Sequence, residues 1–304
     1  MIRLLSERPR LAALLGATCI AFSGIFYRYA DVSPSTATVF RCLYGLPLLA
    51  AVAWMEHRRH GGLPWSTIRI AAVAGVFFAG DLTFWHHAVD AVGAGLSTVL
   101  GNLQVLVVGI VAWLLFGERP SRAVLLALPV VLVGVVLISG VIGSDAYGEN
   151  PPLGVLLGLL TAICYGGYLL IIRHGGQDQR RPAGPVAVST LSTAIVAALF
   201  SIPIGDLNVV PSWPSHGWLA IYGLTSQSLG YLLISVSLPR LPAVLTSIIL
   251  LAQPVMTVGL AMVLLGEAPS LAQLVGVALV VGGIAIATVP FDRLRRVTVS
   301  ATSP

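Results

Sequence analysis

The sequence has no lysine and little charge of either sign. Charged residues make up only 10% of its 304 residues, whereas 57% are apolar. Soluble proteins carry roughly 25% charged residues, and a soluble fold of this length needs a charged surface that this composition cannot supply. All 17 cationic residues are arginine, which we attribute to a GC-rich genome. The composition excludes an ordinary soluble domain. The net charge of +5 implies no nucleic-acid partner, because the placement of the arginines explains it.

Motifs for metal, redox or nucleotide chemistry are also missing. The three cysteines Cys19, Cys42 and Cys164 fall in apolar stretches without metal or redox spacing, so we interpret them as small buried residues. His86 and His87 are adjacent, and neighbours on a helix point about 100° apart, so they cannot chelate a metal together; we expect them to make interface contacts near a helix end. The sequence has no Gly-x-x-x-x-Gly-Lys-Ser/Thr loop, which excludes ATP hydrolysis by this chain. We predict no cofactor and no metal.

Ten apolar segments are each long enough to cross a bilayer, which takes roughly 20 residues. The segments lie near 11–30, 34–54, 70–89, 92–115, 122–142, 153–173, 184–204, 217–237, 243–265 and 270–290. The first is too long for the apolar core of a signal peptide. The sequence therefore predicts an all-α integral membrane protein with ten transmembrane helices and short loops.

The arginines predict the orientation of these helices, because cytoplasmic loops are enriched in positive charge. If the N-terminus is cytoplasmic, 15 of the 17 arginines lie inside and the other two, Arg28 and Arg41, lie within helices. Arg58, Arg59 and Arg69 then belong to the second loop. The external loops carry acidic residues instead: Asp31, Asp90, Asp145, Glu149, Asp206 and Glu267. We predict that both termini are cytoplasmic, in a multi-pass protein of the cell membrane.

The chain contains an internal repeat. Residues 116–121 read Phe-Gly-Glu-Arg-Pro-Ser and residues 265–270 read Leu-Gly-Glu-Ala-Pro-Ser, an offset of 149 that also places Gln104 on Gln253 and Ala94 on Ala243. We predict two five-helix repeats, residues 1–149 and 150–304. Because five is odd, the second repeat starts on the other side of the membrane, and inverted repeats are the architecture of alternating-access transporters.

The residues around this repeat resemble a known family. Four features are similar to the EamA-type transporters of the drug/metabolite superfamily. They are Leu-Leu-Phe-Gly-Glu-Arg-Pro-Ser at 114–121, its counterpart at 263–270, the pair Gln253-Pro254, and Arg41 after Phe40. The resemblance implies two five-helix repeats and export of amino acids, related metabolites or drug-like molecules. Val105 stands where the second repeat has Pro254, so we expect helix 4 to be straighter than helix 9.

Polar side chains inside membrane helices are costly and mark functional sites. Asp81 lies near the middle of the third segment, with Trp85 one turn beyond it. We interpret Asp81 as a cavity carboxylate that binds substrate and couples transport to protons; the alternative is a structural partner for Arg41. Trp85 is either a cavity wall or an interfacial anchor.

Central residues of other segments complete the candidate substrate-binding set. They are Asn102, Gln104, Tyr165, Gln227, Tyr231, Gln253 and Pro254. Amide side chains both donate and accept hydrogen bonds, which suits mixed polar solutes, and Pro254 frees a backbone carbonyl. The alternative for the amides is hydrogen bonding between helices, and the tyrosines are also common as packing.

Three further charged residues have other predicted roles. Arg41, on the outer side of the second segment, draws in anionic solutes, snorkels outward or braces a neighbouring helix; we favour a structural or electrostatic role. Glu118 and Glu267 sit at helix ends, where we expect them to fix the tight turns between helices 4–5 and 9–10 or to form a gate. Substrate contact is not expected there.

Together these features predict a secondary transporter that is not an enzyme. A small solute binds between the repeats, and the bilayer is the other partner. The export is either proton-coupled through Asp81 or, as the alternative, uncoupled facilitation or exchange. A membrane enzyme acting on lipids would need a nucleophile–base pair, and a non-transporting assembly partner would gain little from a polar midplane. A monomer suffices for transport, and a homodimer stays open.

Overall fold

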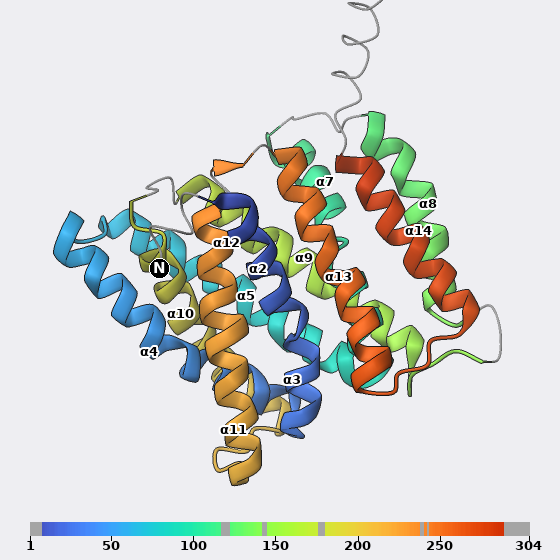
Figure 1. The fold of residues 1–304 in the computed structure, drawn as a ribbon, viewed down its shortest axis with the longest axis horizontal. Coiled ribbons are helices and arrows are strands. Elements are labelled where there is room, and N and C mark those ends of the chain that lie inside the picture. The colour runs from blue at the N-terminus through green and yellow to red at the C-terminus, as the bar shows by residue number, and fades with distance from the viewer. Residues whose placement is uncertain are drawn as a thin grey trace, which may run out of the picture.

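The fold is that of a computed structural model, in which every regular element among the described residues is a helix (Figure 1). The structure describes residues 8–116, 122–141, 145–175, 180–237, 240–241 and 243–288. The elements are α2 (Pro9–Ala21), α3 (Ser23–Ala30), α4 (Pro34–His60), α5 (Trp65–Val92), α6 (Ala94–Gly101), α7 (Gln104–Phe116), α8 (Arg122–Ile138), α9 (Pro151–Gly175), α10 (Ala183–Ile204), α11 (Trp213–Tyr222), the π-helix η1 (Gly223–Gly230), α12 (Tyr231–Ser237), α13 (Ala243–Leu264) and α14 (Leu271–Thr288).

These elements fall into ten segments along the described chain, one for each predicted membrane helix. Six of the ten are long and apolar enough to cross a membrane: Pro9–Ala30, Pro34–His60, Trp65–Val92, Pro151–Ile172, Ala183–Ile204 and Trp213–Ser237. The other four contain shorter apolar helices, at Ala94–Val108, Arg122–Ile138, Leu250–Leu264 and Leu271–Ala287. Large apolar side chains such as Leu126, Ile202 and Val263 are exposed on the outside, as a protein surrounded by lipid tails requires. The chain is a multi-pass membrane protein.

Some predicted helix ends are wrong because hydropathy stops at the first charges whereas the backbone helix does not. Helix α4 runs on from the predicted end at 54 to His60, and α5 begins at Trp65 rather than at 70. Arg58 and Arg59 therefore lie in the last turn of α4, and Arg69 lies in α5; none of them is in the loop. Backbone hydrogen bonds still favour the helix where the chain leaves the hydrocarbon layer.

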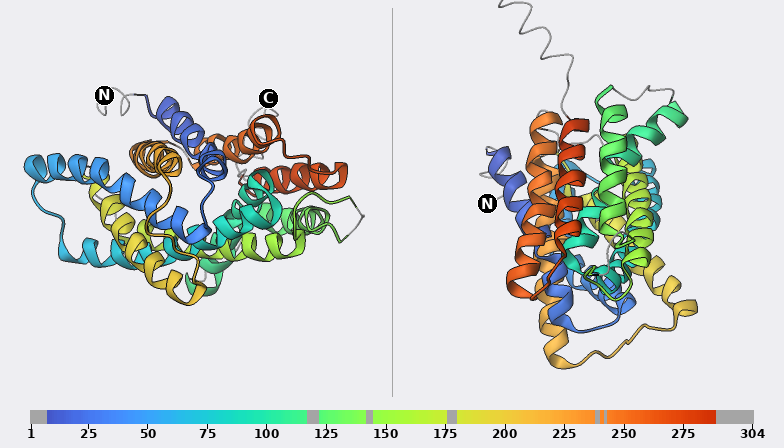
Figure 2. Two further views of the ribbon diagram at one scale, coloured as in Figure 1. Left: turned by 90° about the horizontal axis from the view of Figure 1, so that it is seen from below. Right: turned by 90° about the vertical axis from the view of Figure 1, so that its right-hand side faces the viewer.

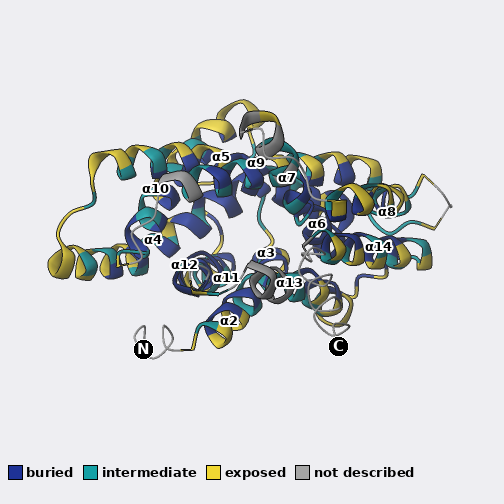
Figure 3. Cartoon of the chain, turned by 90° about the horizontal axis from the view of Figure 1, so that it is seen from above, coloured by how far each residue is buried: buried dark blue, intermediate teal, exposed yellow. Residues whose placement is uncertain are grey.

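The helices pack side by side in pairs that join the two halves of the chain. Helix α5 packs along α9, α14 along α8, and α10 against both α4 and α5. Viewed end on, the helices form an open, shallow arrangement rather than a filled cylinder (Figure 2). The buried residues face inward between the rows of helices, and the exposed ones cover the outer helix faces and the two ends (Figure 3).

Helices 4 and 9 run in opposite directions. In Figure 1, α6 and α7 ascend while α13 descends, and the turn that follows α13 contacts the start of α6 through Glu267 and Ala94. Inverted repeats require this relation of the two helices.

Three of the ten segments are interrupted near their middle. Helix 1 breaks at Phe22, helix 4 at Asn102 and Leu103, and helix 8 contains the π-helix η1. The Asn102 amide donates to Thr98 O at 2.8 Å, competing with the helix ladder. The expectation that helix 4 is straighter than helix 9 is wrong: α13 continues through Pro254, whereas helix 4 is broken two residues before Gln104. A proline inside a helix is tolerated where neighbouring helices stabilise it.

The backbones of α8 and α14 approach each other closely at Gly134 and Gly276. A Cβ added to Gly276 would lie 2.6 Å from Gly134 O, whereas a Cβ on Gly282 of the same helix meets nothing within 4 Å. We expect Gly276→Ala to destabilise the protein by about 1–3 kcal/mol through overpacking. Gly282→Ala should be neutral or stabilise by up to about 1 kcal/mol, because alanine favours the helix. Thermal unfolding in detergent measures both, and equal melting temperatures would contradict this packing.

Candidate functional site

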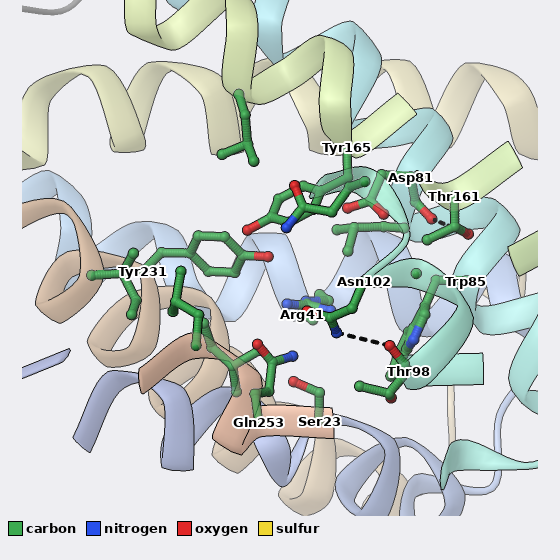
Figure 4. A pocket seen from close by; sticks show the side chains of 17 residues that line it. Ser23, Arg41, Asp81, Trp85, Thr98, Asn102, Thr161, Tyr165, Tyr231 and Gln253 are labelled. Carbon is green, nitrogen blue, oxygen red and sulfur yellow. Dashed lines mark hydrogen bonds between the residues drawn. The ribbon is translucent and has the colours of Figure 1, made fainter. Parts of the chain in front are cut away.

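A cavity of about 140 Å³ lies between the two halves of the chain (Figure 4). It is lined from α2, α3, α4, α5, α6 and α7 of the first half and from α9, α12 and α13 of the second. The lining residues are Ile20, Ser23, Arg41, Asp81, Leu82, Trp85, Thr98, Gly101, Asn102, Gln104, Thr161, Tyr165, Leu169, Tyr231, Ile234, Leu250 and Gln253. An apolar cavity with a few convergent polar groups is the usual form of a small-molecule site.

Most of the residues proposed from the sequence meet at this cavity. Seven of the nine candidate substrate-binding residues line it: Asp81, Trp85, Asn102, Gln104, Tyr165, Tyr231 and Gln253. Gln227 and Pro254 are not among the lining residues. Gln227 is fully buried, and its Oε1 accepts from Nε of Arg41, which itself lines the cavity.

The guanidinium of Arg41 is held by helix 8. Arg41 is 2% exposed and therefore does not reach the surface, which excludes the snorkelling alternative in this structure. Its Nε donates to Gln227 Oε1 at 3.1 Å, and its Nη1 donates to the Tyr222 hydroxyl at 2.6 Å. The guanidinium also lies 4.4 Å from the centre of the Tyr222 ring, within the range of a cation–π contact. These contacts brace helix 8 while the side chain still lines the cavity.

His86 belongs to the same hydrogen-bond network. It is fully buried, so the expectation of interface contacts is wrong for this residue. Arginine can only donate, so the Tyr222 oxygen accepts from Arg41, and the same hydroxyl lies 3.0 Å from His86 Nε2. The Leu82 carbonyl oxygen lies 2.7 Å from His86 Nδ1 and can only accept, so Nδ1 carries a proton; Thr38 Oγ1 lies 2.8 Å from the same nitrogen.

Asp81 brings the opposite charge to the cavity. It is buried on α5 beside Trp85 and lines the same cavity as Arg41. The two side chains form no ion pair within 4 Å; the ion pair found in the described part of the chain joins Arg28 and Asp90 instead. Burying charges is costly unless each has a partner. A carboxylate and a guanidinium that share a cavity without direct contact leave room for a group between them.

Gln104 presents an unused acceptor. Its side chain is 7% exposed and lines the cavity, and among the described residues its Oε1 has no hydrogen-bond partner. Leaving a buried polar atom unpaired costs roughly 1–3 kcal/mol. A bound molecule with an N–H or O–H group would remove that cost.

Several polar residues of the site were not predicted from the sequence. Ser23, Thr98 and Thr161 line the cavity, and Thr161 Oγ1 donates to Asp81 O at 3.4 Å. Thr98 lies one turn before Asn102, a spacing that could have identified it. Tyr222 and Ser23 gave no such signal, because small polar residues and tyrosines are common in membrane helices.

Glu267, expected to fix the turn between helices 9 and 10 or to form a gate, contacts the first half of the chain with its carboxylate. Its carboxylate accepts from Ala94 N at 2.5 Å and from Gly95 N at 3.1 Å, which caps the start of α6. Burial raises the pKa of Glu267, and the two backbone N–H groups partly offset this rise. Gly93 has φ +88°, and a Cβ there would lie within 2.9 Å of this carboxylate, so glycine suits the position. Glu118 lies outside the described residues.

A ten-segment membrane fold with a polar cavity between its halves is typical of membrane transporters. The profile of the EamA-like transporter family matches residues 9–140 and again 152–289. The chain therefore belongs to the EamA-like transporter family, in two repeats.

Individual relatives are similar over almost their whole length. The uncharacterized protein PA1977 of Pseudomonas aeruginosa is 29% identical over 291 residues, which cover 93% of this chain and 96% of that one. The uncharacterized transporter YxxF of Bacillus subtilis is 22% identical, covering 92% of this chain and 89% of that one. A crystal structure described only as that of a protein shares the fold, with a TM-score of 0.62 and 23% identity over 93% of this chain and 98% of that one.

The network around Arg41 yields a prediction that needs no knowledge of the solute. Tyr222→Phe keeps the ring under Arg41 but removes the hydroxyl, leaving Arg41 Nη1 and His86 Nε2 without that partner. We expect a loss of about 1–3 kcal/mol of stability, because buried polar groups become unpaired. Thermal unfolding in detergent measures it. The control is Tyr29→Phe, whose hydroxyl bonds Leu264 O at an exposed position and should cost less; an equal loss in both variants would contradict the network.

Proposed function

We propose that this protein is a secondary transporter that carries a small amphoteric metabolite through the cavity by alternating access. The observation that supports this most directly is the placement of Arg41 and Asp81 around one buried cavity between the repeats, without contact with each other. A solute with both an anionic and a cationic group, such as an amino acid or a related metabolite, would satisfy both. Gln104 Oε1 would accept a hydrogen bond from it.

The walls of the cavity widen this solute class. Trp85, Tyr165 and Tyr231 place aromatic surface beside the charged groups, and aromatic faces pack well against apolar groups and attract cations. A drug-like cation with a polar arm would use the same walls. Arg41 favours the amphoteric metabolite, because a plain cation would be repelled by the guanidinium.

In the proposed orientation, the protein lies in a bacterial cell membrane and both of its termini are in the cytoplasm. The arginine distribution supports it, and the turn that carries Glu267 then faces outward. We propose that the contact of Glu267 with the start of α6 closes the cavity on that side; Tyr29 donates a hydrogen bond to Leu264 O at 3.1 Å nearby. Export would begin from the opposite side, where solute enters from the cytoplasm.

The repeat suggests how the opposite state is held. The offset of 149 pairs Glu118 with Glu267, and it pairs positions 94 and 95 with positions 243 and 244 at the start of α13. We propose that Glu118 caps the start of α13 when the cytoplasmic side closes, while Glu267 releases α6. The two halves, 1–149 and 150–304, would thus exchange equivalent contacts at opposite ends of the cavity, and one monomer would suffice.

Asp81 is the proposed coupling residue. Counterflow in proteoliposomes with a panel of amino acids, sugars and cationic drugs identifies a transported class, first without and then with an inward proton gradient. We expect Asp81→Asn to abolish uphill transport driven by the gradient while exchange continues, because an amide binds no proton at this position. Asp31→Asn, a matched change at an exposed helix end with φ 49°, should keep the coupling.

The alternative function is an uncoupled facilitator or exchanger. It predicts that a pH gradient has no effect on the wild type and that Asp81→Asn changes nothing about the driving force. Coupling that survives in Asp81→Asn would contradict the role of Asp81, and the absence of any transported class would contradict the proposed solute chemistry.

Glu267 provides a test of closure that does not depend on the solute. Glu267→Ala removes two charge-assisted hydrogen bonds worth roughly 1.5–3 kcal/mol each, which shifts the equilibrium toward outer opening by roughly tenfold or more. We expect a cysteine at Thr98, in a background without Cys19, Cys42 and Cys164, to react faster with an impermeant thiol reagent added outside. Glu149→Ala, at an exposed position, is the control. Unchanged labelling in Glu267→Ala would show that this contact does not hold the outer side closed.

A further inference from the structure

A second cavity, remote from the first, lies between the C-terminal half of α4 and the start of α10. It has a volume of about 370 Å³ and is open at its edge. Its walls are largely apolar, formed by Leu46, Ala50, Ala53, Ile68, Ala187 and Leu191. We call this cavity the α4–α10 groove. None of its residues lines the transport cavity.

The polar groups of the groove gather at one end. Glu56, His57 and Arg181 line that end, and His57, Arg58, Arg59 and His60 form the last turn of α4. The Glu56 carboxylate is already engaged, since it accepts from Ala183 N and Gly184 N at 3.1 Å. Arg181 Nη1 donates to the carbonyls of Gly61 and Gly62, which ties the loop after α4 to the start of α10. Arg181 is thus the arginine that lines this end of the groove, and Arg58 and Arg59 add two more in the adjoining turn of α4.

The length and position of the groove match one leaflet of a bilayer. From Leu46 to His57 the helix rises roughly 16 Å at 1.5 Å per residue, which is about half of the roughly 30 Å hydrocarbon core. Trp54 and Trp65 are 61% and 68% exposed near the charged end, and exposed tryptophans are typical of the membrane–water interface. Arg58 lies over the Trp54 ring, 5.3 Å from its centre.

We propose that the α4–α10 groove binds an anionic phospholipid, with an acyl chain along the apolar walls and the phosphate at the arginine-rich end. Basic clusters at the end of transmembrane helices attract anionic head groups, and apolar grooves between helices accept the chains. A zwitterionic phospholipid would fill the same walls but gain less at the cationic end. This inference is independent of the proposed transport function.

The test uses the purified full chain and two probe lipids with identical acyl chains, phosphatidylglycerol and phosphatidylcholine. Native mass spectrometry counts the bound lipids, and thermal unfolding in detergent measures stabilisation by each lipid. We expect phosphatidylglycerol to bind tighter by roughly tenfold or more. Equal binding of the two lipids would overturn the proposal.

Two pairs of variants locate the binding. Ala50 and Ala51 are adjacent exposed residues of α4, but only Ala50 lines the groove, so Ala50→Trp should lose the preference for phosphatidylglycerol and Ala51→Trp should keep it. Likewise, Arg58→Ala with Arg59→Ala should reduce phosphatidylglycerol binding more than the equal charge loss of Arg10→Ala with Arg122→Ala. If both members of either pair behave alike, the lipid responds to the general surface, and the groove site is wrong.

Discussion

A guanidinium buried within a bundle of membrane helices constrains much of this structure, because each of its donors needs a partner away from water. Arg41 finds its partners on helix 8, in Gln227 and Tyr222. Gln227 in turn donates to Thr190 Oγ1 at 2.9 Å on α10, and Tyr222 bonds His86 on α5. One cation thereby couples four helices, and a shift of helix 8 relative to α4 would break bonds that water cannot replace.

The irregular geometry of helix 8 is consistent with this constraint. The π-helix η1 lies where helix 8 meets α4, and Ser228 Oγ donates to Gly45 O at 2.8 Å. A Cβ on Gly223 would lie 2.7 Å from Arg41 O, so the backbones approach closely there. Segments of π-helix are rare and occur frequently at functional sites. The close approach places Gln227 and Tyr222 against the guanidinium, whose remaining surface lines the cavity.

The short helix α6 contributes both to the cavity and to the Glu267 contact. Thr98 and Gly101 of α6 line the cavity, and the start of the same short helix is capped by Glu267 from the other repeat. The eight residues of α6 therefore connect the Glu267 contact with the wall of the cavity. Helix 4 breaks directly after α6. We propose that this break is the hinge at which α6 tilts during alternating access.

Burial in lipid imposes long apolar runs and makes each polar exception informative, so the sequence alone predicted the membrane class, the ten segments, the internal repeat and eight of the seventeen cavity-lining residues. Only the tertiary structure decided which polar exceptions meet. In the structure, Gln227 lies behind Arg41, and His86 is buried in the core. The carboxylate of Glu267 contacts the first half of the chain, although the residue itself belongs to the second. Helix 4 is interrupted although it contains no proline, whereas α13 continues through Pro254. Such outcomes depend on hydrogen bonds between residues far apart in the chain, and periodicity along one helix carries no information about its partners.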